Sequence, residues 1–314
     1  MNIAPLGHWA AGGLGHEDVM YPELFHIGSV TIHSFGVMMA LAFVTAGVVT
    51  AWQFRRKGLD PELTYSLLIA AIVGGVVGSK VHYLIVHPDQ FRVASFSGSG
   101  LIWYGGLFGG ALAVFVVARL AKPRVAVIAD AIAPALAAAY AVGRVGCLLN
   151  GDDYGVPTSL PWGLSFPKGS PPTTVDVHPT QIYESLASLA ILALLVWVVA
   201  PRLRRDGSLF WAYLGFAGVE RFLVEFVRTN DPVALGLTQA QWTSIMLLVA
   251  GVVGFWWLER RSTAGGSGRV RPAPAGGRVP PRKAQAGSGS RSPGAKRGSV
   301  RSKARGKPGG RGTR

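Results

Sequence analysis

The sequence has very little cysteine and few charged side chains for its length. Cys147 is the only cysteine among 314 residues, and Asp, Glu, Lys and Arg together make up 15% of the chain. A single cysteine excludes an intrachain disulfide and any zinc site built from several thiolates. So little charge, combined with 49% hydrophobic residues, is untypical of a soluble domain and indicates a protein that crosses a membrane several times.

Acidic residues are absent from the last part of the chain. Residues 261–314 contain fifteen Lys or Arg and no Asp or Glu, which leaves sixteen basic against sixteen acidic residues in positions 1–260. The net charge of +15 therefore belongs to the tail, and we expect no specific partner among nucleic acids. The tail is rich in Gly, Ser and Pro, so we predict a disordered cytoplasmic extension; attraction to anionic lipid is the alternative.

Seven apolar runs approach or reach the length that a helix needs to cross about 30 Å of hydrocarbon. They cover residues 30–54, 63–86, 101–118, 125–149, 180–200, 209–228 and 237–258. We therefore predict an all-α fold, namely a polytopic membrane protein whose domain of about seven transmembrane helices spans residues 30–260. Residues 1–29 form an extracytoplasmic segment in this prediction, and the proline-rich residues 150–179 form a long outer loop.

Basic residues lie mainly on one side of these runs. The segments after the first, third and fifth runs carry nine Lys or Arg, at positions 55, 56, 57, 119, 122, 124, 202, 204 and 205. The opposite segments carry only three. Because positive residues mark the cytoplasmic side of a membrane, we predict an outer N-terminus and a cytoplasmic C-terminus.

Glycine is concentrated in the second and third runs. The second run contains Gly74, Gly75 and Gly78, and the third begins with two glycine pairs at 105–106 and 109–110. Helices approach closely where side chains are missing, so we interpret these glycines as a helix-packing face rather than a phosphate-binding loop.

Polar side chains within the runs gather at the predicted outer side. An arginine is costly in hydrocarbon, which makes Arg144 in the fourth run a candidate functional residue. Arg221, Glu225 and Arg228 in the sixth run follow i, i+4, i+7 spacing and share one helix face. Guanidinium groups from two helices suit the phosphate of an amphipathic ligand, because they stay charged and match its oxygens.

The polar groups lie at one depth of the membrane, and the sequence has no internal repeats. Both features argue against a transporter.

These residues also have purely structural interpretations. Arg144 could pair with Asp152 and fix the following loop. Arg221 could form an internal salt bridge with Glu225, and this is the role that we expect for Glu225. His178, directly before a proline, could either position the loop or take part in the chemistry.

Asp130 lies away from this polar level. Fourteen residues, or about 21 Å of helix, separate it from Arg144, so the two side chains cannot touch. We expect its carboxylate to favour the positive N-terminal end of its own helix or to pair with Arg124.

Residues 143–155, GRVGCLLNGDDYG, resemble the signature of the bacterial prolipoprotein diacylglyceryl transferases. Other segments similar to this family follow in order, at residues 33–36, 104–106, 129–130, 178–184 and 221–228. The resemblance covers roughly residues 20–260 and leaves out the tail. The order and spacing of these segments, more than any one of them, make the resemblance specific.

The resemblance implies a transferase that moves the diacylglyceryl group of phosphatidylglycerol onto the lipobox cysteine of a preprolipoprotein. Glycerol 1-phosphate leaves and a thioether forms, as the first step of bacterial lipoprotein maturation. The implied partners are these two substrates and the lipid bilayer, with no cofactor and no metal, in a multi-pass protein of the bacterial inner membrane. Cations placed near the leaving phosphate suit this chemistry.

Position by position, the resemblance also implies a set of site residues. The catalytic candidates are Arg221, Tyr104, His178 and Glu225, and the substrate-binding candidates are Arg144, Asn150, Asp152 and Gly155.

The chain departs from the family pattern at several positions. The family commonly has His, a proposed thiol base, where this chain has Tyr104, and an unperturbed tyrosine with a pKa near 10 is a poor base at neutral pH. His178 could take its place. Further departures are Phe35, Lys80, Cys147, Asp152 and Ala217, where the family commonly has Tyr, Arg, Asn, Glu and Tyr. We expect a divergent but active enzyme; the alternative is a catalytically altered paralogue that binds phospholipid.

Overall fold

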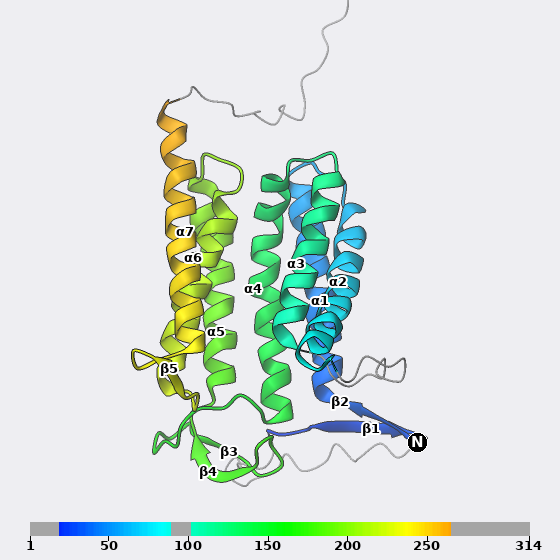
Figure 1. Ribbon diagram of the computed structural model, residues 1–314, viewed down its shortest axis with the longest axis vertical. Coiled ribbons are helices and arrows are strands. Elements are labelled where there is room, and N and C mark those ends of the chain that lie inside the picture. The colour runs from blue at the N-terminus through cyan, green and yellow to red at the C-terminus, as the bar shows by residue number, and fades with distance from the viewer. Residues whose placement is uncertain (1–18, 89–101, 265–314) are drawn as a thin grey trace, which may run out of the picture. The chain divides into compact units, whose positions relative to one another are not determined.

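The computed structural model describes residues 19–88 and 102–264, and these residues are mostly helical (Figure 1). Seven long helices follow one another: α1 Ser34–Arg56, α2 Leu63–Val86, α3 Trp103–Leu120, α4 Val125–Asn150, α5 Thr180–Ala193, α6 Ser208–Val224 and α7 Gln239–Ala264. The helix of α5 continues through a π-helical segment, Leu194–Val199, and a 3₁₀ turn, Ala200–Arg202, while a 3₁₀ turn, Glu225–Val227, extends α6. The disordered tail and part of the N-terminal segment that we predicted lie outside the described residues.

Five helices in the described part of the chain are long and apolar enough to cross a membrane. They are Ser34–Arg56, Leu63–Val86, Val125–Asn150, Thr180–Arg202 and Gln239–Arg260. The apolar part of α3, Tyr104–Leu120, is shorter, and α6 has 17 residues. These lengths confirm a mostly helical, polytopic membrane protein. The prediction of seven spans is supported for five of them, and the orientation of the termini stays a prediction.

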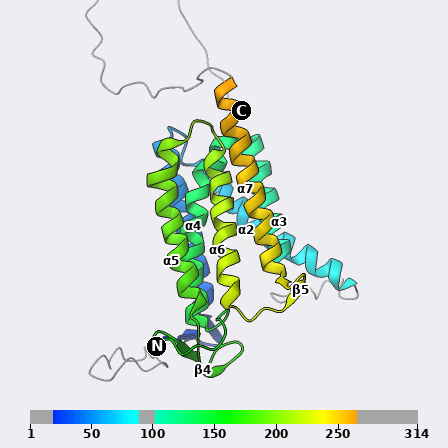
Figure 2. The same cartoon turned by 90° about the vertical axis from the view of Figure 1, so that its left-hand side faces the viewer.

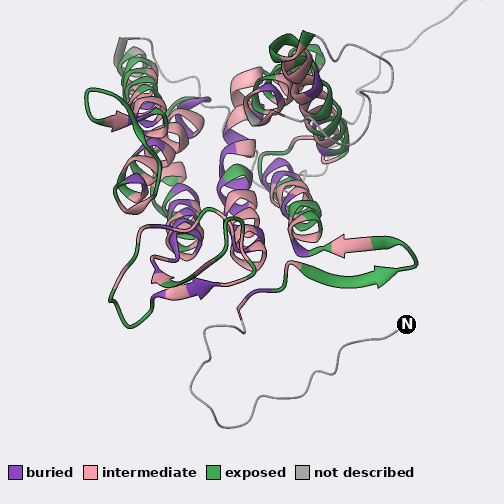
Figure 3. Ribbon diagram, turned by 60° about the horizontal axis from the view of Figure 1, so that its bottom comes forward, coloured by how far each residue is buried: buried purple, intermediate pink, exposed green. Residues whose placement is uncertain are grey.

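The helices pack as an alternating up-and-down bundle (Figure 1, Figure 2). The closest pairs are α2 with α3, α1 with α4, α6 with α7, and α4 with α5. Many large apolar residues of the helices are exposed, as a lipid-covered surface requires. Figure 3 shows exposed residues along the helices in green. The interior is centred on α4, whose buried residues are mainly alanines that let neighbouring helices approach.

The glycines of α2 and α3 form a direct contact between these two helices. A Cβ atom added to Gly78 would overlap with the carbonyl oxygen of Gly105, and one added to Gly109 would overlap with the carbonyl oxygen of Gly74. Backbones approach this closely only without side chains between them. The interpretation of these glycines as a helix-packing face is confirmed.

Three antiparallel hairpins qualify the all-α prediction. Their strands are β1 Glu23–Ile27 with β2 Val30–His33, β3 Leu164–Phe166 with β4 Thr173–Val177, and β5 Pro232–Ala234 with β6 Leu237–Thr238. All three lie at the end of the bundle where α4 ends and α5 begins (Figure 1). The first apolar run therefore begins as a strand, and its helix begins only at Ser34. The turn glycines Gly28 and Gly236, with φ of +61° and +73°, are the sequence signal for two of the hairpins.

At the opposite end of the bundle, Asp130 has a role that the sequence did not predict. Its two carboxylate oxygens accept hydrogen bonds from the backbone N–H groups of Gly207, at 2.7 Å, and Phe210, at 3.0 Å, so it caps the start of α6. Arg124 pairs with Asp206 instead, at 2.5 Å. The expected pair with Arg124 was wrong, because the donors to Asp130 come from residues at least 77 positions away. Its attraction to the N-terminal end of its own helix stays a prediction.

Candidate functional site

The end of α4, the start of α5 and the end of α6 bring charged side chains together. We call Arg144, Glu184, Arg221, Glu225, Arg228 and Asp153 the arginine network. Its three arginines are 8–25% exposed at their side chains, and the Glu184 and Glu225 side chains are fully buried. Buried charges persist only when they are paired and hydrogen-bonded, and the network meets this condition with three guanidiniums and three carboxylates.

Arg144 is held on two sides. Its Nη1 donates a hydrogen bond to the carboxylate of Asp153 at 2.7 Å. Its Nη2 donates to the hydroxyl of Tyr140, one helical turn earlier, at 2.8 Å, and lies 3.1 Å from a carboxylate oxygen of Glu184. The guanidinium also stacks over the Tyr140 ring at 4.9 Å, so its plane is fixed.

Glu184 is the centre of the network. Its Oε1 accepts a hydrogen bond from the Tyr140 hydroxyl at 2.9 Å and lies 3.9 Å from Nη1 of Arg221. Its Oε2 lies 3.8 Å from Nη1 of Arg228. Three guanidiniums from two separate parts of the chain therefore face one buried carboxylate. Glu184 is the last residue of the family-like segment 178–184, but the resemblance implied no role for it.

Glu225 has the structural role that we expected. One of its oxygens lies 2.7 Å from Arg221 and 3.7 Å from Arg228. The other accepts hydrogen bonds from Asn230 at 2.8 Å and from the hydroxyl of Thr238 at 2.6 Å. Glu225 thus joins the end of α6 to the start of α7. The helix-face prediction for positions 221, 225 and 228 is confirmed.

Asp153 bridges two arginines of the network. Its Oδ2 accepts from Nη1 of Arg144 and its Oδ1 accepts from Nη2 of Arg228 at 2.6 Å. Burial raises the pKa of the Asp153 carboxyl, but attraction to Arg228 and Arg144 outweighs this and holds the pKa below its ordinary value. The alternative in which Arg144 pairs with Asp152 was wrong, because the neighbouring carboxylate takes that position.

The loop after α4 is tied to the first turn of α5. Asn150 donates to the carboxylate of Asp152 at 2.8 Å, and Gln181 donates to the Asp152 carbonyl at 2.5 Å. The Thr180 hydroxyl donates to the carbonyl of Asp153 at 2.6 Å. Two of the substrate-binding candidates thus shape the loop that carries Asp153.

Gly155 lies where two segments of backbone meet. A Cβ atom added there would overlap with the carbonyl oxygen of Val227, and Gly155 forms an isolated β-bridge with Arg228. Any side chain at this position would push the end of α6 away from the loop. Gly155 therefore sets the distance between the two parts that carry Asp153 and Arg228.

The structure places His178 and Tyr104 on different elements. The backbone of His178 bonds to Gly155 and Val156, and its Nδ1 lies 3.2 Å from the hydroxyl of Tyr183. Tyr104 is half-buried at the start of α3, which packs mainly against α2. His178 positions the loop, as one of its two interpretations proposed, and a catalytic role for either residue stays a prediction.

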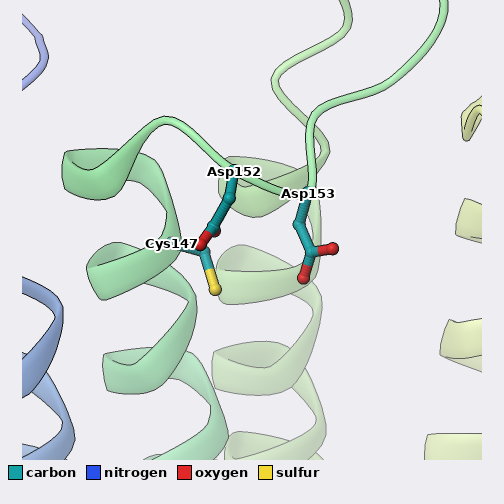
Figure 4. Close-up of side chains that lie close together, drawn as sticks. All are labelled: Cys147, Asp152 and Asp153. Carbon is teal, nitrogen blue, oxygen red and sulfur yellow. The ribbon is translucent and has the colours of Figure 1, made fainter. Parts of the chain in front are cut away.

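Cys147, Asp152 and Asp153 bring a sulfur and two carboxylate oxygens within 4.8 Å of one another, a spacing that could hold a metal ion (Figure 4). Positive charge already lies there, since both Asp153 oxygens accept from guanidiniums and Arg144 Nη1 is 3.8 Å from the Cys147 sulfur. We therefore treat this group as the edge of the arginine network.

Comparisons with known proteins cover most of this chain. The family model "Prolipoprotein diacylglyceryl transferase" matches residues 22–257. Proteins named phosphatidylglycerol–prolipoprotein diacylglyceryl transferase are similar throughout this region. The one from Clostridium tetani is 32% identical over 75% of this chain and 97% of its own length, and the one from Geobacter sulfurreducens is 34% identical over 72% and 89%. A third, from Dehalococcoides mccartyi, is 32% identical over 76% and 94%.

The matched region contains α1 to α6, most of α7 and all six residues of the arginine network. Identity above 30% over more than two thirds of the chain extends far beyond one short motif. The chain therefore belongs to the prolipoprotein diacylglyceryl transferase family, a family of membrane enzymes.

Proposed function

We propose that this protein transfers the diacylglyceryl group of phosphatidylglycerol to the cysteine thiol of a prolipoprotein. The sulfur forms a bond to a glycerol carbon of the lipid, the bond from that carbon to the phosphate oxygen breaks, and glycerol 1-phosphate leaves. The names of the relatives support both substrates. They do not favour the alternative of a paralogue that only binds phospholipid.

One observation carries the proposal: Arg144 from α4 and Arg221 and Arg228 from the end of α6 converge at one end of the bundle. The leaving phosphate gains negative charge as its bond to carbon breaks. Guanidinium groups that are already in place stabilise this charge without reorganising. Arg221 Nη1 and Arg228 Nε lie 2.7 Å and 3.7 Å from one oxygen of Glu225, which holds both guanidiniums at this end of the bundle.

The position of the network suits a lipid headgroup. It lies at one end of a bundle that exposes many large apolar residues, where the phosphate of a bilayer lipid would lie level with the arginines. Asn150, Asp152 and Gly155 shape the adjoining loop and would contact the headgroup through it. With the positive loops inside, this end faces away from the cytoplasm. We therefore propose a multi-pass protein of the bacterial inner membrane with an outer N-terminus.

The thiol proton needs an acceptor, and the candidates are Tyr104 and His178. An imidazole titrates near neutral pH, whereas a phenol does so near pH 10. If His178 is the base, His178→Gln lowers the rate of thioether formation strongly, while Tyr104→Phe leaves it close to that of the original protein. The opposite result assigns the proton transfer to Tyr104.

The test of the function is a product assay with phosphatidylglycerol and a lipobox peptide, using the full chain in proteoliposomes. We expect a thioether product, and a fall of about 100- to 1000-fold in the rate for Arg144→Ala. The matched control is Arg124→Ala, which removes an exposed arginine that pairs with Asp206 at the other end of the bundle. Thioether formation by Arg144→Ala at the original rate, or no product from the original protein, would contradict the proposal.

A further inference from the structure

The three carboxylates of the arginine network differ in accessibility. The side chains of Glu184 and Glu225 are fully buried, whereas that of Asp153 is 42% exposed. The arginines beneath it are covered, with 12% of Arg144 and 8% of Arg228 exposed. An anion that approaches from outside therefore meets the Asp153 carboxylate before it meets these two guanidiniums.

Asp153 holds its two partners as a phosphate would. One carboxylate oxygen lies 2.7 Å from Nη1 of Arg144, and the other lies 2.6 Å from Nη2 of Arg228. A phosphodiester also presents two unesterified oxygens, and guanidinium groups bind carboxylate and phosphate with the same geometry. The same two guanidinium edges cannot serve both anions at once.

We propose that the Asp153 carboxylate occupies the phosphate position between Arg144 and Arg228, and that the substrate phosphate displaces it. Asp153 is thus a built-in competitor that sets how tightly the protein binds an anionic lipid. This inference rests on the proposed function for the identity of the lipid.

The charges of the network support the displacement. Among the six residues of the network, three guanidiniums face three carboxylates while Asp153 is in place. Displacing the Asp153 carboxylate removes one negative charge from between Arg144 and Arg228, and the phosphate of a phosphodiester returns one. Glu184 and Glu225 cannot leave so easily, because both are fully buried and the departure of either would leave covered guanidiniums without a partner.

The backbone allows the carboxylate to leave while the loop stays in place. The carbonyl of Asp153 accepts separate hydrogen bonds from Thr180, at 2.6 Å, and Arg228, at 2.9 Å. Rotation of the side chain about its own bonds breaks neither. The residue has φ of +62°, a conformation that Asn and Gly adopt more readily than other residues. Asn and Gly are therefore the substitutions that keep this loop.

The test measures binding of a short-chain phosphatidylglycerol to the purified full chain in detergent micelles by calorimetry. Asp153→Asn and Asp153→Gly should each lower the dissociation constant about three- to tenfold, because the binding-competent state no longer competes with an internal anion. Diacylglycerol, which carries no phosphate, should bind all forms equally. Glycerol 1-phosphate distinguishes a lipid headgroup from a free phosphate: tightening for both ligands, or for the lipid alone, supports the displacement.

The control is Asp206→Asn, which removes an aspartate from an ion pair at the other end of the bundle and should leave the dissociation constant unchanged. Unchanged or weaker binding by both Asp153 variants would overturn the inference. Asp153 would then have only a structural role, as the ion-pair partner of Arg144 and Arg228. Tighter binding without thioether product in any form would leave the inference standing and refute the proposed function. Thioether product with unaltered binding would refute the inference alone.

Discussion

The two ends of α4 each meet a buried carboxylate, and the two are satisfied in different ways. Asp130 accepts only from the backbone N–H groups that begin α6. Glu184 instead faces side chains: three guanidiniums and the phenol of Tyr140. The backbone donors at a helix start are used by the cap, whereas each guanidinium carries five N–H donors and can bind a second anion from the position it already holds. The difference teaches that burial of an acid does not by itself mark a site, and that the kind of donor facing it does.

The largest effect should follow from Glu184→Gln. The substitution leaves three buried guanidiniums facing a neutral amide, and breaking a buried ion pair on one side costs about 3–5 kcal/mol. We expect this loss in the free energy of unfolding in detergent, and a fall of at least about 100-fold in thioether formation. Glu23→Gln, at an exposed residue of β1, is the control. A stable and fully active Glu184→Gln would show that the carboxylate is dispensable.

Asp130→Ala should remove the cap at the start of α6, at the end of α4 that lies away from the arginine network. Two backbone donors at the start of α6 lose their acceptor, which should lower the free energy of unfolding by about 2–4 kcal/mol. The rate per folded molecule should stay unchanged, because the arginine network lies at the other end of the bundle. The measurement is thioether formation divided by the amount of folded protein. A lower rate per folded molecule would refute the separation of the two ends.

Gly78→Ala tests how much the glycine contact between α2 and α3, which lies outside the network, stabilises the protein. The added methyl group overlaps with the backbone of Gly105, so α2 and α3 must separate, at a cost of about 1–3 kcal/mol. Gly215→Ala meets no atom within 4 Å and is the matched control. Thermal unfolding should distinguish the two variants, and equal unfolding temperatures would show that the glycine contact contributes nothing.

The smallest effect concerns acid. Because the pKa of Asp153 in the folded protein lies below its ordinary value of 3.8, the bridge stabilises the protein above the unfolded value and is lost as the pH falls through the folded one. Between about pH 5 and pH 3, the unfolding temperature of the original protein should therefore fall slightly more steeply than that of Asp153→Asn. Parallel curves would mean that the two arginines do not lower this pKa.

Local patterns in the sequence were enough for most of the fold. The apolar runs predicted the helices to within a few residues, with α2 predicted at its observed bounds, and the glycines predicted the contact between α2 and α3. The hairpins were missed because strands of two to five residues give too short a pattern to distinguish from a loop. For the same reason, the first predicted helix began at residue 30, where the structure has β2, instead of at Ser34.

The candidate site was predictable in part. Arg144 and Arg221 stood out because charge is rare in an apolar run, and their convergence on one carboxylate agrees with the expectation that two helices present guanidiniums together. Asp153 and Glu184 did not stand out. Acidic residues are common in loops and near the starts of helices. The position of such a residue in the sequence does not predict which arginine it will contact.

The sequence by itself determined that this chain is a bundle of apolar helices with a few arginines among them, because hydrophobicity and charge are properties of single residues and of short repeats. Only the tertiary structure decided which acids face those arginines. Asp153 meets Arg228 across 75 positions, and Glu184 at the start of α5 meets Arg144 near the end of α4. Ion pairs depend on distance in space, and in a helical bundle that distance is set by how the helices pack.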